Sequence, residues 1–515
     1  MIQSDDITMK EALAQSSNSC LRGDMPAEEF RRHGHKIVDW IADYLANPGR
    51  YPVLSQVEPG YLKQALPKTA PDTGEPFEAM LADLDRLILP GVTHWNHPGF
   101  FAYFAISGSA PGILGEMISA ALNVNAMLWR TSPSATELEE VTLDWLRRLI
   151  GLPDSFSGVI YDTASISTLC AIAAARENVE ELQSRRLGLA GSPEEPSNVH
   201  PRMYTSEQSH SSVERAGITL GIGQEGVRKI ETDSEFRMNP ASLARAIAED
   251  RAAGWRPFCV VATTGTTSTT SVDPVSLIAD ICERERLWLH VDAAYGGPAA
   301  ILPEKRWVLD GCERADSIVV NPHKWLFVPV DLSALYCKRM DVLRNAFSII
   351  PEYLRTDVND ETRNFMDYGP QLGRRFRALK FWFVMRYFGA DGLASRIREH
   401  IRLANQFAGW VDESKDFERM APTPLSTVCF RANPADCGTK FPDDVARESY
   451  LDKLNQDLMD GVNRTGRVFL SHTKLNGKFT IRLAIGNIRT SEAYVRLAWD
   501  LLGETLGELR LKPVS

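Results

Sequence analysis

Lys324 is the first candidate for covalent chemistry in this sequence. It lies in Asn-Pro-His-Lys-Trp, residues 321–325, directly after the apolar run Ser317–Val320. Such a run predicts a buried strand, and a lysine at its end is partly withdrawn from water. Burial lowers the pKa of an amine and leaves a nucleophilic nitrogen. Taken alone, a His-Lys pair says little about function.

Asp292 ends another apolar run, Trp288–Asp292, one predicted strand before the lysine. A buried carboxylate needs a partner. The nitrogen of a pyridine ring is such a partner, and the carboxylate keeps that nitrogen protonated so that the ring can accept electrons. Taken alone, Asp292 is more typical of a helix cap or an ion pair.

Three further polar segments also follow predicted strands. Residues 163–168, Thr-Ala-Ser-Ile-Ser-Thr, precede a helix, where hydroxyl groups and free amides bind phosphate or simply cap the helix. His210 and Thr267 each lie just beyond a strand. Because ligands bind at the carboxyl ends of strands in an open parallel sheet, these features together predict one binding site.

The elements that position these residues alternate between short β-rich runs and helices from about residue 158 onward. The strands lack strict polar–apolar alternation, so both faces of the sheet are covered and the sheet is mostly parallel. The predicted strands are Gly158–Tyr161, Met203–Ser206, Phe258–Thr263, Trp288–Asp292, Ser317–Val320 and Ala334–Lys338, with helices at Thr168–Glu181, from Val213 and near Pro274–Glu285. The pattern predicts an α/β fold.

The two ends of the chain have a different character. Amphipathic helices near residues 30–45 and 76–89 come before the sheet, and later segments mix helices with antiparallel strands. The later elements are helices Arg374–Tyr387 and Leu393–Val411, strands Ser426–Arg431, Val468–Ser471 and Phe479–Ile485, and a helix from about Ser491. We predict an N-terminal helical segment (1–109) that packs on a partner subunit, a large α/β domain (110–380) and a small C-terminal α+β domain (381–515).

Composition limits the class of protein. The formal net charge is −10, from 57 basic and 67 acidic residues, which argues against a general affinity for nucleic acid or anionic membranes. No apolar stretch reaches the roughly 18 residues that span a bilayer, and residues 1–15 lack the apolar core of a signal peptide. The eight cysteines form no CxxC pair, and no cluster of ligands indicates a metal. We therefore expect a cytoplasmic protein with reduced thiols and no metal.

Four motifs together resemble the group II decarboxylases that depend on pyridoxal 5'-phosphate (PLP), most closely the aromatic-L-amino-acid decarboxylases. They are Asn-Pro-His-Lys-Trp at 321–325, His-Val-Asp-Ala-Ala-Tyr at 290–295, His-Ser-Ser-Val-Glu-Arg-Ala at 210–216 and Leu-Gly-Arg-Arg-Phe-Arg at 372–377. The resemblance covers about residues 25–502. It implies the fold type I architecture of the PLP-dependent transferases (aspartate aminotransferase-like), PLP as cofactor and a homodimer with its active site at the subunit interface.

The resemblance also implies roles for individual residues. Lys324 would carry the cofactor as a Schiff base, Asp292 would pair with the pyridine nitrogen, and His210 would stack on the ring. The rest of the cofactor shell would be Ala164, Ser165, Thr267, Ala294, Asn321 and His323, and the substrate pocket would be Trp95, Tyr103, Phe104, Asn125, Met127 and His210. These roles imply decarboxylation of an aromatic L-amino acid (DOPA, tyrosine, phenylalanine or tryptophan) to the amine and CO2.

Residue 365 departs from the family pattern. The family has a loop, here about residues 354–372, whose tyrosine is thought to protonate the substrate. Counting back without gaps from Gly373, Phe365 takes the place of this tyrosine, while Tyr368 could serve if the loop has another register. A phenylalanine there resembles the family's aldehyde synthases, which use O2 and release aldehyde, ammonia and hydrogen peroxide. An aromatic acetaldehyde synthase is therefore the alternative function.

The substrate pocket also departs from the pattern. Asn125 and Met127 stand where aromatic decarboxylases usually have apolar or aromatic residues, so the preferred ring stays open. An acidic substrate such as glutamate suits an aromatic pocket less well. A non-catalytic scaffold with this fold would be expected to lose Lys324 or Asp292, and both are present.

Overall fold

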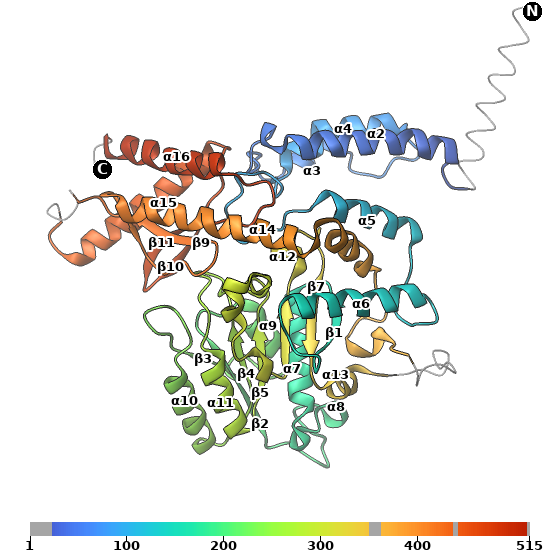
Figure 1. Ribbon diagram of the computed structural model, residues 1–515, viewed down its shortest axis with the longest axis vertical. Coiled ribbons are helices and arrows are strands. Elements are labelled where there is room, and N and C mark those ends of the chain that lie inside the picture. The colour runs from blue at the N-terminus through green and yellow to red at the C-terminus, as the bar shows by residue number, and fades with distance from the viewer. Residues whose placement is uncertain (1–22, 350–361, 436–440, 512–515) are drawn as a thin grey trace, which may run out of the picture. The chain divides into compact units, whose positions relative to one another are not determined.

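The computed structural model describes residues 23–349, 362–435 and 441–511 (Figure 1). The chain forms two compact units. The smaller lies within residues 23–93, and the larger holds residues 52–54 and everything described from His94 onward. All the residues predicted to do chemistry belong to the larger unit.

The smaller unit is helical, as the sequence predicts. Its elements are α2 (Ala27–Ala46), η1 (Pro48–Arg50), α3 (Tyr61–Ala65), α4 (Phe77–Asp83), η2 (Leu84–Ile88) and η3 (Leu89–Gly91). The helix predicted over residues 76–89 is therefore shorter than expected, because its second half forms one wide turn and a 3-10 turn at Pro90. Phe30 and Met80 keep 68% and 50% of their surface exposed.

A seven-stranded sheet forms the centre of the larger unit. The strands are β1 (Ser157–Tyr161), β2 (His200–Ser206), β3 (Val227–Ile230), β4 (Trp255–Thr263), β5 (Trp288–Asp292), β6 (Ser317–Val320) and β7 (Ser333–Cys337), in the order β1-β7-β6-β5-β4-β2-β3. Strands β2 to β6 pair in parallel, and only β7 is antiparallel to its neighbours. The mostly parallel sheet is thus confirmed. Strand β3 was not predicted, because half of its Val-Arg-Lys-Ile sequence is charged.

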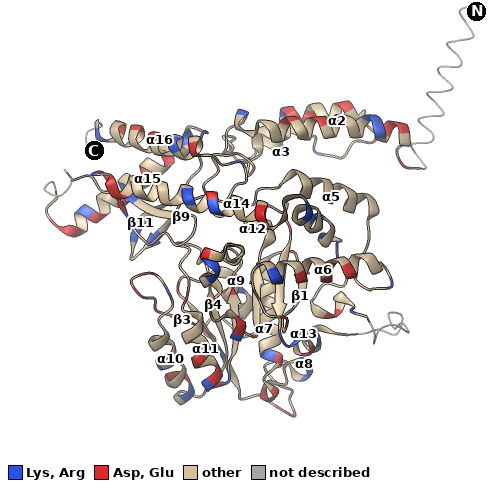
Figure 2. Ribbon diagram, viewed as in Figure 1, with Lys and Arg blue, Asp and Glu red and all other residues tan. Residues whose placement is uncertain are grey.

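Both faces of this sheet are buried, which explains the continuous apolar runs. Successive residues of one strand belong to different cores: Ile160 and Val260 join one cluster, while Val159 and Val261 join the other. Because side chains alternate across a strand, this division follows directly from the pleat. Charged residues lie mainly on the helices, and few occur on the central strands (Figure 2).

Helices cover each face of the sheet. The first core includes apolar side chains of α6 (Pro133–Leu149), α10 (Pro240–Ala252) and α11 (Val275–Glu285), and the second those of α7 (Ala164–Glu177) and α9 (Ser211–Thr219). Other helices of this region are α5 (Ala110–Leu122), η4 (Glu180–Leu182), α8 (Ser184–Leu187), η5 (Gly297–Ile301), η6 (Pro303–Leu309), η7 (Cys312–Arg314), α12 (Pro322–Trp325), α13 (Met340–Phe347) and η9 (Phe365–Tyr368).

A second, antiparallel sheet lies near the carboxyl end of the chain. Its strands are β8 (Phe417–Arg419), β9 (Thr427–Ala432), β10 (Ser471–Leu475) and β11 (Lys478–Ala484), in the order β10-β11-β9-β8, with helices α14 (Arg377–Glu413), α15 (Asp444–Arg464) and α16 (Glu492–Leu511). The two helices predicted over residues 374–411 form one element, α14, interrupted at Gly389. Strand β8 and helix α15 were not predicted.

The strand predicted at Val468–Ser471 is wrong. The strand β10 begins at Ser471 instead, because the turn Asn476-Gly477 has positive φ at both residues and fixes the register of the hairpin with β11. Val468 and Leu470 are buried in the core of this region without belonging to a strand. The Asn-Gly pair was the signal that would have placed this hairpin.

The described cysteines are buried and unpaired, namely Cys170, Cys259, Cys282, Cys312, Cys337 and Cys429. Cys20 and Cys437 lie outside the described residues. No helix among residues 23–349, 362–435 and 441–511 is long and apolar enough to cross a membrane.

A buried ion pair ties the segment after η9 to the central sheet. Arg374 Nη2 lies 2.6 Å from Glu139 Oε1 and donates to the carbonyl of Ile160 at 2.7 Å. Glu139 Oε1 also accepts the Ile160 N–H at 2.8 Å. Helix α6, the end of β1 and the segment at Arg374 therefore share one buried network.

Replacing Arg374 with Met should destabilise the protein strongly. Glu139 would remain buried without a cation, and such a loss costs about 3–5 kcal/mol. The matched control is Arg375→Met, since Arg375 is 58% exposed and pairs with Glu116 at the surface, where a pair contributes about 0–1 kcal/mol. Urea unfolding measures both changes. Equal destabilisation by the two variants would refute the role of the buried network.

Candidate active site

A pocket of about 310 Å³ lies at the carboxyl ends of the parallel strands. Thr263 ends β4, Asp292 ends β5, and Asn321 follows β6, so neighbouring strands deliver these residues to one edge of the sheet. The lining residues are Tyr103, Phe104, Thr163, Ala164, Ser165, His210, Thr263, Gly265, Thr267, Asp292, Ala294, Tyr295, Asn321, His323, Lys324 and Arg482. The structure therefore brings together eleven of the residues predicted from the sequence.

Lys324 lies on the short helix α12 and reaches into the pocket. Its side chain is half-buried, and its Nζ lies 5.5 Å from the centroid of the Phe104 ring. Burial lowers the pKa of Lys324, while the charge of Asp292 opposes that shift. The amine is thus easier to deprotonate than that of an exposed lysine.

Asp292 is buried at the end of β5, and one of its carboxylate oxygens accepts a hydrogen bond. Its Oδ1 accepts the N–H of Ala294 at 3.1 Å, and its Oδ2 accepts no hydrogen bond from the part of the chain that the structure describes. A buried carboxylate oxygen without a donor suits a ligand that carries a proton on nitrogen.

His210 caps helix α9 and is held by Ser212, the second residue of the helix. Its Nδ1 accepts the Ser212 N–H at 3.2 Å and lies 2.8 Å from Ser212 Oγ. The pKa of His210 is lowered, first by burial and then by the charge of Lys324. A neutral ring with Nδ1 accepting carries its proton on Nε2.

His323 and Asn321 form a second polar pair in the pocket wall. His323 Nδ1 accepts the Leu332 N–H at 2.9 Å, so the ring proton is on Nε2, which lies 3.3 Å from the Asn321 carboxamide. Burial lowers the pKa of His323 to about 3. The carboxamide oxygen is the group that accepts from Nε2–H, because oxygen and nitrogen of an amide are assigned by their partners. The Asn321 amide group then has donors left for a ligand.

The amino end of α7 borders the pocket. The helix begins at Ala164, and no side chain caps its first turn. Ala164 and Ser165 line the pocket at this end, so free amides and the positive end of the helix dipole face it. Gly265 also lines the pocket with φ +92, and a Cβ there would lie 2.8 Å from Gly296 N, so this loop requires glycine.

Stacked aromatic rings form one wall. The Phe104 and Tyr295 centroids are 3.7 Å apart, and Tyr295 and Trp325 are 4.8 Å apart with parallel planes. Trp325 Nε1 donates to His400 Nδ1 at 2.9 Å, which anchors the stack in the core. Tyr103 also lines the pocket, beside Phe104. The wall offers a rigid, flat, apolar surface to a ring.

Arg482, on β11, reaches the same pocket and was not predicted. It donates from Nε to the Ser268 carbonyl at 2.8 Å, from Nη2 to the Thr267 carbonyl at 2.7 Å and from Nη1 to Ser471 Oγ at 3.1 Å. Its side chain is buried, and no carboxylate of the described residues pairs with it. Burial lowers its pKa. Two of its five N–H groups remain for a ligand, and so does its charge.

The predicted residues that do not line this pocket are Trp95, Asn125, Met127, Phe365 and Tyr368. Trp95 stacks 5.9 Å from Tyr103 and thus supports a lining residue. Asn125 Oδ1 accepts the Arg374 N–H at 2.9 Å, and the Met127 carbonyl accepts the Met366 N–H at 3.1 Å. Asn125 and Met127 therefore belong to the network around Arg374.

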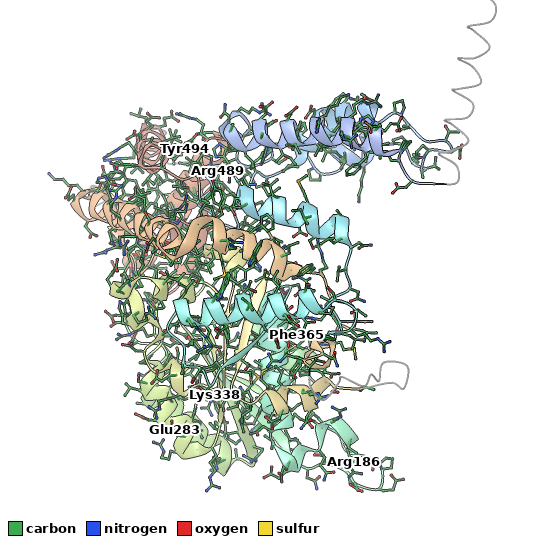
Figure 3. All side chains as sticks on the ribbon, turned by 45° about the vertical axis from the view of Figure 1, so that its right-hand side comes forward. Arg186, Glu283, Lys338, Phe365, Arg489 and Tyr494 are labelled. Carbon is green, nitrogen blue, oxygen red and sulfur yellow. The ribbon has the colours of Figure 1, made fainter. Side chains whose placement is uncertain are left out.

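Phe365 belongs to the second core of the central sheet. It is 2% exposed, with the Arg374 guanidinium 4.6 Å from its ring centroid; Figure 3 labels its position. Tyr368 is half-buried, and its carbonyl accepts the Tyr161 hydroxyl. The first part of the predicted loop, residues 354–361, lies outside the described residues.

The sequence model described as the pyridoxal-dependent decarboxylase conserved domain matches residues 59–433. The chain belongs to the pyridoxal-dependent decarboxylase family. The match confirms the predicted family, enzyme class and cofactor, and the parallel sheet confirms the predicted fold class.

Known proteins similar to this decarboxylase include plant enzymes of more than one activity. A tryptophan decarboxylase of Camptotheca acuminata is 42% identical over 492 residues, which is 93% of this chain and 94% of that protein. A phenylacetaldehyde synthase of Petunia hybrida is 42% identical over 486 residues, covering 92% and 94%. The solved structure of Oryza sativa TDC with PLP and tryptamine has a TM-score of 0.89 at 37% identity and covers 94% of this chain and 99% of that one.

The residues of the pocket fit PLP. Lys324 provides an amine, and Asp292 Oδ2 is an acceptor that receives no hydrogen bond from the described residues. Helix α7 provides an uncapped amino end. The buried Oγ1 of Thr263 also has no partner in the described structure. An aldehyde, a protonated ring nitrogen and a phosphate would satisfy these groups in turn.

The lining residues that the sequence interpretation missed have different origins. Thr163 and Tyr295 lie inside motifs that were recognised, and Thr263 and Gly265 lie close to Thr267 in sequence. All four could therefore have been predicted from the sequence. Arg482 comes from the C-terminal sheet, more than two hundred residues from Thr267. The sequence around it, Thr-Ile-Arg-Leu-Ala, is typical of an ordinary strand, and no local pattern indicates that Arg482 lines a pocket.

Replacing Arg482 with Met should weaken PLP binding about tenfold or more. The variant loses charged hydrogen bonds, each contributing about 1.5–3 kcal/mol, that hold the loop presenting Gly265 and Thr267. Lys478→Met on the same strand is the control, because Lys478 is 41% exposed and outside the pocket. Titration of apoprotein with PLP, followed by absorbance, measures both dissociation constants. Unchanged PLP affinity in the Arg482 variant would contradict this role.

Proposed function

We propose that this decarboxylase converts an aromatic L-amino acid to the corresponding amine and CO2. The observation that carries the proposal is one pocket in which an amine of lowered pKa, a buried carboxylate and a stacked aromatic wall converge. The similarity to plant decarboxylases of tryptophan supports the aromatic class. DOPA, tyrosine, phenylalanine and tryptophan are the candidate substrates.

The chain's own residues would hold the cofactor from three sides. Bound PLP supplies an electron sink for the electron pair that remains when the substrate carboxylate leaves as CO2. Lys324 supplies a neutral amine for covalent attachment, because burial lowers its pKa. Asp292 holds a proton on the ring nitrogen through its free oxygen, and the first amides of α7 bind the phosphate. His210, neutral at pH 7, offers its ring face and its Nε2–H.

Arg482 and the aromatic wall would orient the amino acid. The guanidinium has two free N–H groups and no carboxylate partner in the described chain, so it attracts the substrate's carboxylate. Phe104 and Tyr295 would pack against the substrate ring. Fixing the two ends of a small substrate restricts the angle of the bond that breaks, and this restriction is the protein's main contribution to the rate.

A second copy of the chain would complete the site. Leu114, Ile118 and Leu122 follow each other at helical spacing on α5 and are 50%, 43% and 57% exposed. Asn125 and Met127, predicted to contact substrate, lie just beyond this exposed face in sequence and do not line the pocket of their own chain. We propose a homodimer in which α5 and the N-terminal helices pack on the partner, and we keep the cytoplasmic location as a prediction.

The proposed function is tested with a panel of amino acids. Each of the four aromatic substrates, and glutamate for comparison, is incubated with holoenzyme, and CO2, amine, aldehyde and peroxide are measured together. We expect CO2 and amine in equal amounts from at least one of them, and none from Lys324→Ala. Sodium borohydride should fix PLP on the peptide that contains Lys324. Release of CO2 from glutamate alone, or from none of the amino acids, would contradict the proposal.

Phe365 supports a second candidate, an aromatic acetaldehyde synthase. A phenylalanine carries no exchangeable proton, so residue 365 cannot return one to the substrate, and a relative of similar identity is a phenylacetaldehyde synthase. If this candidate is correct, the wild type releases aldehyde, ammonia and peroxide with CO2.

In the proposed homodimer, Phe365→Tyr should then shift the product from aldehyde toward amine, because residue 365 lies outside the pocket of its own chain and its phenol would supply the missing proton at the partner's pocket. Tyr368→Phe is the matched control, since it removes the only other hydroxyl proposed for this role. The ratio of amine to peroxide is the measured quantity. A wild type that releases amine without peroxide would exclude the aldehyde synthase, and loss of amine in Tyr368→Phe would then identify Tyr368 as the proton donor.

A further inference from the structure

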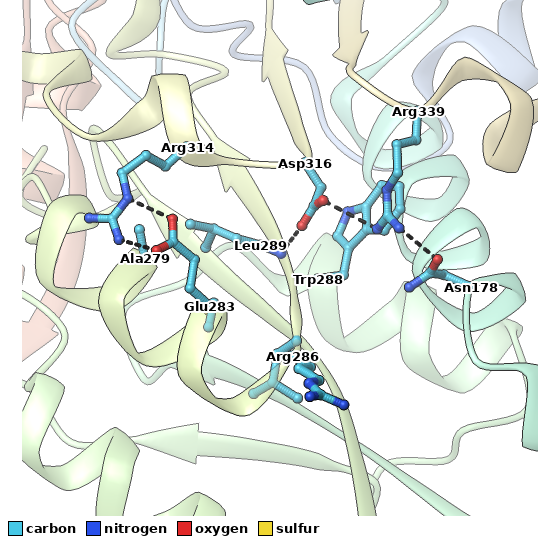
Figure 4. A pocket seen from close by; sticks show the side chains of 11 residues that line it. Asn178, Ala279, Glu283, Arg286, Trp288, Leu289, Arg314, Asp316 and Arg339 are labelled. Carbon is cyan, nitrogen blue, oxygen red and sulfur yellow. Dashed lines mark hydrogen bonds and ion pairs between the residues drawn. The ribbon is translucent and has the colours of Figure 1, made fainter.

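A second pocket, of about 410 Å³, lies at the opposite edge of the central sheet (Figure 4). Trp288 begins β5 at this pocket, whereas Asp292 ends the same strand at the active site. Asp316 precedes β6 and Arg339 follows the antiparallel β7, so both reach this edge as well. No residue lines both pockets.

Every carboxylate oxygen that lines this pocket already accepts a hydrogen bond. Glu283 receives Arg314 Nε at 2.8 Å and Nη2 at 2.7 Å on its two oxygens. Asp316 receives the Leu289 N–H at 2.8 Å on Oδ2 and Arg339 Nη2 at 3.2 Å on Oδ1. Each carboxylate oxygen of the pocket therefore already has one donor.

The donors are not saturated. The Arg286 side chain is exposed and makes no hydrogen bond or ion pair within the described structure. Arg339 donates from Nη1 to Asn178 and from Nη2 to Asp316, which leaves one N–H on each of these nitrogens without an acceptor among the described residues. In Figure 4, Arg286 lies below both the Arg314–Glu283 pair and the Arg339–Asp316 pair, with no dashed line to either. A ligand that fits this arrangement must bring acceptors.

The charge of the lining residues also favours a ligand with negative charge. Three guanidinium groups, those of Arg286, Arg314 and Arg339, face two carboxylates, those of Glu283 and Asp316. Helix α11 ends here with its partial negative charge, which the unpaired guanidinium of Arg286 outweighs. Figure 3 shows Lys338 and Glu283 near the same end of the large unit.

The remaining lining is mostly apolar, apart from Asn178, whose Oδ1 accepts a hydrogen bond from Arg339 Nη1 at 2.7 Å. Ala279, Leu287 and Leu289 contribute side chains, and the Trp288 ring lies 4.5 Å beneath the Arg339 guanidinium. Stacking on Trp288 keeps this guanidinium in place. The pocket thus combines the held guanidinium groups of Arg314 and Arg339, the unpaired Arg286 and a small apolar surface.

We propose that this pocket binds a small organic anion, through a carboxylate or phosphate group held by Arg286 and Arg339. The site is separate from the substrate pocket, and its existence does not depend on which amino acid the enzyme decarboxylates. A guanidinium fork recognises both kinds of oxyanion, so the nature of the anion is decided by experiment.

Arginine labelling of the wild-type holoenzyme tests the proposal. The protein, with PLP bound, is treated with p-hydroxyphenylglyoxal in the presence of inorganic phosphate, benzoate or sodium chloride at equal ionic strength. Peptide mass spectrometry follows Arg286, and Arg284 is the internal control because it is outside the pocket on the same helix. We expect phosphate or benzoate, but not chloride, to slow the labelling of Arg286 and leave Arg284 unchanged.

Calorimetric titration of the same anions then measures affinity. Arg286→Gln should weaken binding about tenfold, the effect of one lost charged hydrogen bond, whereas Arg284→Gln removes the same charge with no effect. Arg286 has no partner to lose, so thermal unfolding of its variant should match the wild type. Protection by phosphate alone or by benzoate alone identifies the preferred oxyanion. Equal labelling of Arg286 in all three salts, or equal weakening by both variants, would overturn the proposal.

Discussion

The structure depends on burying an amine and a carboxylate at the ends of two neighbouring strands. Neither Lys324 nor Asp292 has a hydrogen-bond partner that fully satisfies it within the described chain, and burial disfavours the charged form of the lysine. Such an arrangement costs free energy in the empty fold. The cost is offset when a ligand carries an aldehyde toward one group and a protonated nitrogen toward the other. The central sheet must therefore be rigid enough to hold both groups at one edge.

The packing of the sheet supplies that rigidity. Each strand is apolar on both faces, and the two cores lock the strands from opposite sides. The stack of Phe104, Tyr295 and Trp325 extends this rigidity into the pocket wall, because His400 anchors its far end. Two buried arginines hold the loops around the pocket in place. Arg482 holds the turn at Thr267, and Arg374 holds the segments that carry Asn125 and Phe365.

The two edges of the sheet carry positive charge in different ways. At the carboxyl edge, uncapped amides and an unpaired buried guanidinium surround the pocket that fits PLP and an amino acid. At the amino edge, three arginines line the pocket with two carboxylates whose oxygens already accept hydrogen bonds. Both pockets contain donors in excess of acceptors, and both are thereby suited to ligands that carry negative charge. Strands β5 and β6 run from the amino-edge pocket to the carboxyl-edge pocket, and neither strand is longer than five residues.

The sequence by itself determined the family, the cofactor and the residues that follow the parallel strands, because those residues lie in local motifs and the strand ends converge in any such sheet. It also placed Trp288–Asp292 and Ser317–Val320 correctly, since buried strands read as continuous apolar runs. Only the tertiary structure decided the burial of Phe365 and the presence of Arg482 in the pocket. These features arise from contacts between segments hundreds of residues apart, and local pattern carries no information about which distant backbone a side chain will meet.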